Sequence, residues 1–128
     1  MEATAHYDRE NNIVLISGEG SSELTTEKVK HATALAMKVA VEHKCTNLLF
    51  DITMMREAQS IIQLFTDMSN ISLTTGLGSE YKCAVFYNPA TYSPNRAELV
   101  EIVVKNRPNP PFKMFTNRKE AVDWLKEL

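Results

Sequence analysis

Asp51 is a charged residue placed where an apolar run stops. Asn47 to Phe50 are predicted to form a buried strand, and Asp51 follows at its end. In a parallel α/β sheet, the carboxyl end of a strand faces the crevice in which ligands bind. A carboxylate at this point could accept a phosphoryl group, act as a catalytic acid, or cap the loop that follows. Each role requires different neighbouring residues.

The phosphoryl-acceptor role would make the chain similar to a response-regulator receiver domain. Phosphoryl transfer onto a carboxylate needs Mg²⁺, held by a further acidic pair after the first strand, because crowded negative charge must be neutralised. The first two expected strands instead run into HYDR and ISGEG, without adjacent acids, and the lysine expected after the last strand is replaced by Lys113 within FKMF. We therefore predict that Asp51 is not a phosphate acceptor.

Polar side chains follow two apolar runs and could form one crevice. If the strands NLLFD and KCAVF are neighbours, their loops meet above the sheet, where helix N-termini and two arginines could hold an anion. The alternative is structural, because aspartate and asparagine side chains also bond the amides of their own loops. The candidate crevice residues are Asp51, Thr53, Arg56, Asn88, Tyr92 and Arg96.

Other catalytic or cofactor sites find little support. GEGSSE and GLGSEY begin as G-x-G but lack the third glycine and the lysine of phosphate-binding loops, so both are expected to be turns. The histidines are too dispersed for a metal site, and we expect neither a metal nor a cofactor. Cys45 and Cys83 are expected to lie at or in strands as small apolar residues, with raised thiol pKa values that leave them unreactive.

The periodic segments predict one α/β domain over residues 1–128 in the order ββαβαβαβα. A hairpin precedes a helix that begins near Thr25 or Thr26 and ends near His43. Further helices are expected from Arg56 to about Leu73 and from Asn95 to Asn106, each after a strand. The strand FKMF then leads into a closing helix capped by Thr116 or Asn117, with Ala121, Trp124, Leu125 and Leu128 facing inward.

Composition excludes several classes of protein. The net charge is −2, which provides no field for nucleic acid or anionic lipid. No apolar run is long enough to span a membrane, and the polar N-terminus resembles no secretory signal. We therefore expect a cytoplasmic protein.

Four segments together resemble the SpoIIAA-like (STAS-like) family, which is related in fold to anti-sigma factor antagonists and, more distantly, to CRAL-TRIO lipid-binding domains. They are ISGEGSSELTTEKV, NLLFDIT, KCAVFYNPATY and FKMFTNRKEAVDWLKEL. The resemblance covers almost the entire chain and implies a (βα) superhelix with a mixed sheet. Anti-sigma factor antagonists are regulated by phosphorylation of a serine in a D-S-S-G loop. Ser60 occupies that position here, but Gln59, Ile61 and Ile62 replace the rest of the motif, which favours an ordinary helix residue.

The resemblance implies a non-enzymatic cytoplasmic binding or regulatory module that acts through a protein partner or a small ligand. The alternatives are a carrier of a small apolar or lipid-like ligand, and an enzyme that uses the crevice. The second and third expected helices also carry more apolar residues than one sheet can cover. This excess predicts a homodimer through those helices, with Leu64 and Ile71 as contacts.

Overall fold

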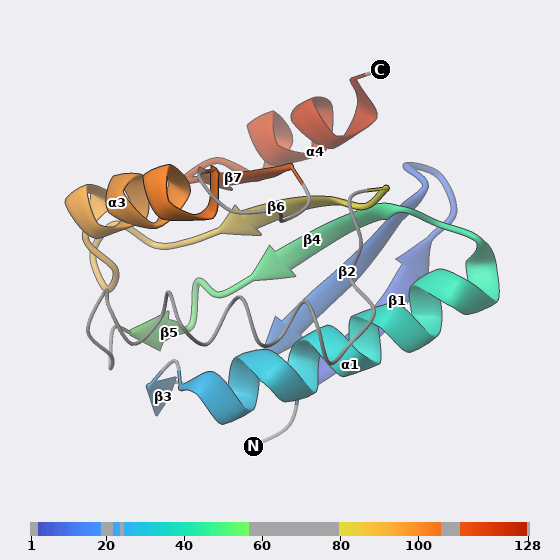
Figure 1. Ribbon diagram of the computed structural model, residues 1–128, viewed down its shortest axis with the longest axis horizontal. Helices are drawn as coiled ribbons and strands as arrows, with labels where there is room; N and C mark the ends of the chain where they lie inside the picture. Colours follow the sequence, from blue (N-terminus) through green and yellow to red (C-terminus); the bar gives the residue numbers. More distant parts are fainter. Residues whose placement is uncertain (1–2, 19–21, 24, 57–79, 106–110, 128) are drawn as a thin grey trace.

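A five-stranded mixed sheet forms the centre of the protein (Figure 1). The computed structural model describes residues 3–18, 22–23, 25–56, 80–105 and 111–127. The strand order is β1-β2-β4-β6-β7, in which β1 and β2 are antiparallel and the other neighbours are parallel. The strands are β1 (Ala3–Asp8), β2 (Ile13–Gly18), β4 (Asn47–Asp51), β6 (Lys82–Phe86) and β7 (Phe112–Phe115).

The opening hairpin is closed by its turn residues. Asp8 Oδ2 accepts a hydrogen bond from Asn11 Nδ2 at 2.9 Å, and Asp8 Oδ1 accepts one from the Asn11 amide at 3.3 Å. Asn12 adopts a left-handed backbone with φ 53°, which asparagine tolerates better than most residues. The turn chemistry confirms the expected hairpin.

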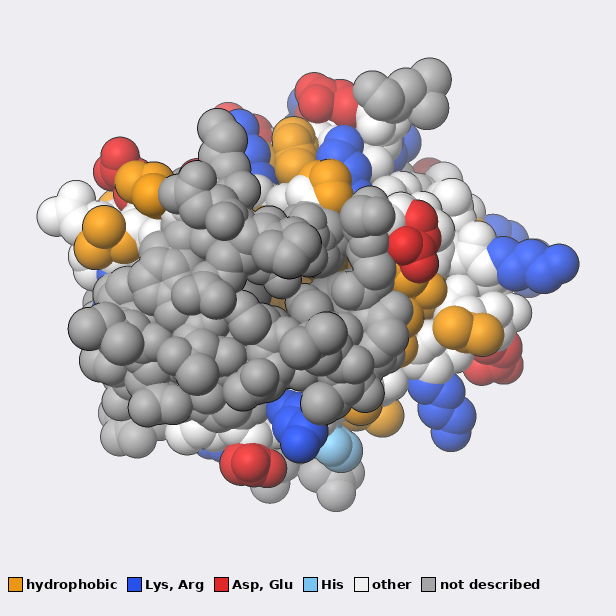
Figure 2. Space-filling view, in the orientation of Figure 1, with side chains coloured by type: hydrophobic (Ala, Val, Ile, Leu, Met, Phe, Trp, Pro, Cys, Tyr) orange, Lys and Arg blue, Asp and Glu red, His pale blue; other side chains and the backbone are white. Residues whose placement is uncertain are grey.

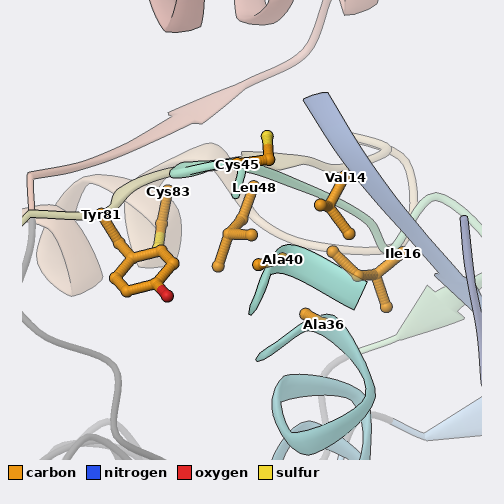
Figure 3. Close-up of a cluster of buried hydrophobic side chains, with 8 residues drawn as sticks. All are labelled: Val14, Ile16, Ala36, Ala40, Cys45, Leu48, Tyr81 and Cys83. Carbon is orange, nitrogen blue, oxygen red and sulfur yellow. The ribbon is translucent and has the colours of Figure 1, made fainter. Parts of the chain in front are cut away.

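Helix α1 (Thr26–His43) lies across one face of the sheet. Thr25 caps it, since its Oγ1 accepts a hydrogen bond from the Lys28 amide at 3.3 Å. Its small residues Ala36 and Ala40 are fully buried and let the helix approach Val14, Ile16 and Leu48 (Figure 3). The helix ends at the expected residue, where Lys44 takes a left-handed conformation and bonds back to the last turn.

Two further described helices complete the layers. Helix α3 (Pro94–Lys105) buries Ala97 and Val100 against Val85 and Met114, on the α1 face of the sheet. Helix α4 (Arg118–Lys126) buries Ala121 and Leu125 on the opposite face. Asn117 caps α4 by accepting the Glu120 amide at 3.1 Å.

The two sheet faces follow from the alternation of side chains along the central strands. Leu48 and Cys83 point toward α1, whereas Leu49 and Ala84 point toward α4. Every residue of this set is nearly inaccessible to solvent, as expected for central strands covered on both faces. Within the described residues, no helix is long and apolar enough to cross a membrane.

The expected helix start at Arg56 is wrong. Met55–Arg56 form a short strand, β5, which pairs in parallel with β3 (Ser22–Glu23). Arg56 is therefore extended, because its backbone belongs to a ladder between the segments that follow β2 and β4. The pairing also turns part of the expected GEGSSE turn into a strand. The rest of the expected second helix, residues 76–79 of the GLGSEY turn, Asn106 and Leu128 lie outside the described residues.

Candidate functional site

The loops after β4 and β6 lie side by side, as the crevice hypothesis required. Asp51 pairs with Phe86 in the register of the two strands, and the Ile52 amide donates to the Phe86 carbonyl at 2.9 Å. Both strands run in the same direction, so their carboxyl ends lie at the same end of the sheet.

Asp51 uses its carboxylate to close its own loop. Its Oδ1 accepts hydrogen bonds from the Thr53 amide at 3.0 Å and from Thr53 Oγ1 at 2.6 Å. Such a turn links an aspartate to the residue two positions on and shapes the chain as it leaves a strand. The geometry matches the third role considered for Asp51, a cap on the following loop.

Asn88 likewise closes its own loop after β6. Its Oδ1 accepts the Ala90 amide at 2.9 Å, and its carbonyl accepts the amides of Thr91 and Tyr92 at 3.0 and 2.9 Å. These bonds fold the NPATY segment into a tight turn before α3. The asparagine side chain is thus engaged within its own loop.

Tyr92 and Arg96 occupy different environments beyond that turn. Tyr92 is buried and packs edge-on against Tyr87, with ring centroids 5.8 Å apart. Arg96 is half-buried in the first turn of α3, and its amide donates to Ser93 Oγ at 3.4 Å. Tyr92 therefore belongs to the core below the loop.

Three parts of the sequence prediction stay predictions. The backbone of Arg56 lies in β5, so the expected convergence of Arg56 and Arg96 near Asn88 remains untested. Ser60 as a phosphorylation position, and Leu64 and Ile71 as dimer contacts, lie outside the described residues.

A second feature, which the sequence did not reveal, lies at the opposite end of the strands. It is an open hollow of about 610 Å³ between the β1–β2 turn, the amino ends of β4, β6 and β7, and the end of α4. No local motif predicts it, because it brings together five separate segments. The residues that line it are Glu10, Asn11, Asn12, Thr46, Asn47, Glu80, Tyr81, Lys82, Pro111, Leu125, Lys126 and Glu127.

Lys82 links two elements at this hollow. Its ammonium donates to the carbonyl of Trp124 and, at 3.3 Å, to that of Glu127, and it lies 4.4 Å from the centre of the Trp124 ring. A cation at a helix C-terminus satisfies carbonyls that lack partners within the helix. Lys82 thus fastens the end of α4 to the start of β6.

The same end of the molecule is tied together by the β1–β2 turn. The Asn12 carbonyl accepts hydrogen bonds from Cys45 Sγ at 3.3 Å and from Asn47 Nδ2 at 3.4 Å. Lys126 Nζ donates to Asn11 Oδ1 at 3.4 Å. The polar groups here join segments that are distant in sequence.

The cysteines fit the structural role expected for them. Both are buried free thiols. Burial raises the pKa of the Cys83 thiol to about 12, which keeps it protonated at neutral pH. Among the residues described, no group of three histidine, cysteine or acidic side chains is placed to hold a metal ion.

The surface carries two contrasting kinds of side chain. Lysines, arginines and acidic residues are interspersed over the described part of the face in Figure 2. Among the residues that the structure describes, four large hydrophobic side chains are conspicuously exposed, namely Val41 at 67%, Met54 at 54%, Leu99 at 49% and Ile102 at 50%. Leu99 and Ile102 are three residues apart on α3, so they share one side of that helix.

Comparison with known proteins places the fold. No protein-family model matches the chain, and neither does any curated protein. Two solved structures are similar over nearly all of both chains. An uncharacterised protein of the DUF3478 family from Shewanella loihica PV-4, described as having a SpoIIAA-like fold, superposes with a TM-score of 0.61 at 19% identity, covering 97% of this chain and 94% of the other.

The second similar structure is an anti-sigma factor antagonist from Mycobacterium paratuberculosis. Its TM-score is 0.59 at 13% identity, and the match covers 98% of this chain and 96% of that one. At these identities the likeness concerns the fold. The α/β architecture with its five-stranded mixed sheet is the SpoIIAA-like, or STAS-like, fold that the sequence resembled.

Proposed function

We propose that this protein is a non-enzymatic regulatory module that acts in the cytoplasm by binding a protein partner. The likeness to an anti-sigma factor antagonist supports a partner that is itself a protein, since that name describes a protein acting on another protein. The observation that carries the proposal is the apolar pair Leu99 and Ile102 on the outer side of α3.

Helix α3 is apolar on two sides. Ala97 and Val100 bury themselves against the sheet, while Leu99 and Ile102 remain about half exposed on the other side. One sheet-facing stripe would need only the first pair. Neighbouring large apolar residues on a helix surface are typical of the centre of a protein interface, where they are desolvated by the partner.

The adjoining loops supply a stiff platform for such binding. Asp51 bonds Thr53, and Asn88 bonds the three residues before Ser93, so the oxygens that could have done chemistry hold turns in place. Interfaces that are already formed in the free protein lose less conformational entropy on binding. This favours a docking role over a catalytic one.

The crevice is the finer part of the proposal. We assign Asp51, Thr53, Asn88 and Arg96 to a rim beside the α3 surface, with Arg96 facing acidic groups of the partner and the buried Tyr92 supporting the rim from the core. Arg56 is assigned to the same rim as part of the proposal. Arginine forms bidentate hydrogen bonds with carboxylates, which would give the contact direction as well as affinity. If so, Arg96→Ala weakens partner binding and makes the remaining affinity less sensitive to salt.

The alternatives find less support among the described residues. A carrier of an apolar ligand needs an enclosed apolar cavity, whereas the hollow beside Lys82 is open and has Glu10, Glu80 and Lys126 on its rim. An enzyme needs groups poised to transfer protons or electrons, whereas Oδ1 of Asp51 and Oδ1 of Asn88 are engaged in turns.

A site-specific cross-linking experiment tests the proposal. A photoreactive amino acid replaces Leu99 in one variant and Val41 in the other, because Val41 is an equally apolar exposed residue on α1. We expect the α3 variant to capture a defined protein from cells that naturally make this chain, and the α1 variant not to do so.

The captured protein is then purified and its affinity measured directly. Leu99→Glu together with Ile102→Glu should weaken binding by at least about tenfold, whereas Val41→Glu should leave it unchanged. Equal effects of both changes would contradict a specific α3 surface. A small molecule retained in a native mass spectrum, with no protein captured, would favour the carrier instead.

A further inference from the structure

The two edge strands of the central sheet, β7 and β1, differ in how their outward-pointing backbone groups are protected. At one edge, β7 is hydrogen-bonded to β6 through Pro111 and Phe115, whose carbonyls accept the amides of Cys83 and Tyr87. The Met114 amide points the other way and donates to Glu101 Oε1 of α3 at 2.7 Å. An α3 carboxylate therefore occupies a donor that another strand could have used.

The opposite edge carries no such block in the part of the chain that the structure describes. β1 pairs with β2 alone, and its six residues, ATAHYD, contain no proline or lysine. Its one carboxylate, Asp8, lies at the end of the strand and is hydrogen-bonded to Asn11 of the turn. Every strand directs alternate amides and carbonyls to each side, so half of those of β1 point away from β2. Proteins usually protect long edge strands with a charge, a proline, a bulge or a covering element.

β1 is also held in a fixed shape. Tyr7 stacks on His43 of α1 with ring centroids 4.3 Å apart, and its hydroxyl donates to Asn12 Oδ1 at 2.8 Å. Ala5 and Tyr7 pack on α1, whereas Thr4 and His6 are exposed on the other face. A preorganised edge loses little entropy when another strand is added to it.

We propose that the free edge of β1 pairs with β1 of a second copy of this chain, which extends the sheet across a two-fold axis. Antiparallel addition to a sheet edge uses main-chain hydrogen bonds on both partners, and a two-fold axis makes both contributions identical. The axis must stand perpendicular to the sheet, so α1 lies on the same side in both copies. Facing residues then also share a side, and the pairing is centred on a single residue.

A register centred on His6 keeps the two Asp8 carboxylates from facing each other. His6 faces its own copy, Ala5 faces Tyr7, and Thr4 faces Asp8. The one carboxylate of the strand then meets a hydroxyl and not another carboxylate, whereas like charges directly opposite each other destabilise a strand pair. This interface is separate from the α3 surface of the proposed function, so either can fail without the other.

Cysteine cross-linking tests the register on the intact protein. His6→Cys should give a disulfide-linked dimer of twice 14.5 kDa under mild oxidation, because the two sulfurs face each other. Thr4→Cys is the matched control, an exposed position on the same face whose new thiol would face Asp8 and should remain unlinked. The native cysteines are buried and do not compete.

Sedimentation and hydrogen exchange test the edge itself. The unaltered protein should sediment as a dimer, His6→Asp should shift it to monomer, and Leu99→Asp should leave the dimer intact. Backbone amides of β1 should exchange more slowly as protein concentration rises, while those of β7 should not change. A monomer at every concentration, a dimer broken by Leu99→Asp and not by His6→Asp, or unchanged exchange of β1 would each overturn the proposal.

Discussion

The carboxyl and amino ends of β4 and β6 are held together in opposite ways. At the carboxyl ends, Asp51 and Asn88 bond residues two to four positions ahead in their own loops. At the amino ends, Asn47 bonds Asn12, 35 positions away, and Lys82 bonds the Trp124 carbonyl, 42 positions away. The first end is built from local turns, and the second joins distant segments.

The contrast shows that side chains which look reactive in a sequence can instead form hydrogen bonds that stabilise the fold. Side-chain oxygens at the ends of parallel strands are suited to ligands, but they are equally suited to capping the loop that leaves the sheet. The amino ends, which hold no such motif, are where the structure concentrates its long-range polar contacts. Changes at the amino ends should therefore destabilise the whole domain more than changes at the carboxyl ends.

The largest effect is expected at Leu125, which lies beside the hollow and is 2% exposed. Leu125→Ala removes apolar contacts with Leu49 and Ala84 and leaves a cavity that the neighbouring strands cannot fill. The free energy of unfolding should fall by about 3 kcal/mol, measured by urea denaturation. Val122→Ala, at a half-buried position of the same helix, is the control and should cost less. Equal losses would mean that α4 is attached more loosely than its packing indicates.

A pH effect should follow at Cys83, three residues before the Phe86 end of β6. Burial raises its pKa from 9.0 to about 12, so above pH 9 the unfolded chain loses a proton that the folded chain keeps. Stability should fall as the pH rises between these two values, by up to about 1.4 kcal/mol per pH unit, and should not depend on this group at lower pH.

The check is to compare urea denaturation of Cys83→Ala and the unaltered protein at several alkaline pH values. The variant should be less stable at neutral pH because of its cavity, but its stability should fall less steeply above pH 9. Burial also raises the pKa values of Tyr81 and Tyr87, which contribute the same direction of change to both proteins. Parallel curves would show that the thiol is more accessible than its surroundings indicate.

A smaller effect is expected from Lys82. Lys82→Met keeps an apolar stem against Trp124 but removes the cation from the last carbonyls of α4. We expect a loss of about 1 kcal/mol, since hydrogen bonds of a charged donor and the helix dipole both contribute. Lys119→Met removes only the exposed pair with Asp123 and should cost less than about 0.5 kcal/mol. Similar losses in the two variants would mean that the Lys82 contacts stabilise the fold no more than an exposed ion pair does.

Much of the fold was predictable because its signals are local. The cap at Thr25, the left-handed turn at Asn12 and the apolar period of α1 each depend on a few consecutive residues. The resemblance to the SpoIIAA-like family then implied a (βα) superhelix with a mixed sheet. The helix start at Arg56 was wrong because β5 is set by pairing with β3, a partner more than 30 positions earlier.

The candidate site was predictable only in its location. Because β4 and β6 are neighbours, Asp51 and Asn88 lie at the same end of the sheet. Whether their side-chain oxygens face a ligand or their own loops depends on the backbone geometry of those loops, which the residue types alone do not predict. Trp124 shows the same limit. It was expected to face inward, and it is half-buried, with one side on Phe115 and a lysine over its ring, so Trp124→Ala should cost less than the loss of a fully buried tryptophan would.

The smallest effect is expected at Asp51, and it separates the two interpretations of this residue. Asp51→Asn keeps the Oδ1 that accepts the Thr53 amide, so stability should change little, whereas Asp51→Ala should cost about 0.5–1 kcal/mol. Incubation with acetyl phosphate and Mg²⁺ should leave the intact mass of the unaltered protein unchanged, because Asp51 Oδ1 is engaged in its turn and the described residues contain no acidic cluster placed to hold a metal ion. An added phosphate that disappears in Asp51→Asn would instead show that Asp51 is a reactive group. The carboxyl ends of the strands would then carry out chemistry, whereas the amino ends would only hold distant segments together.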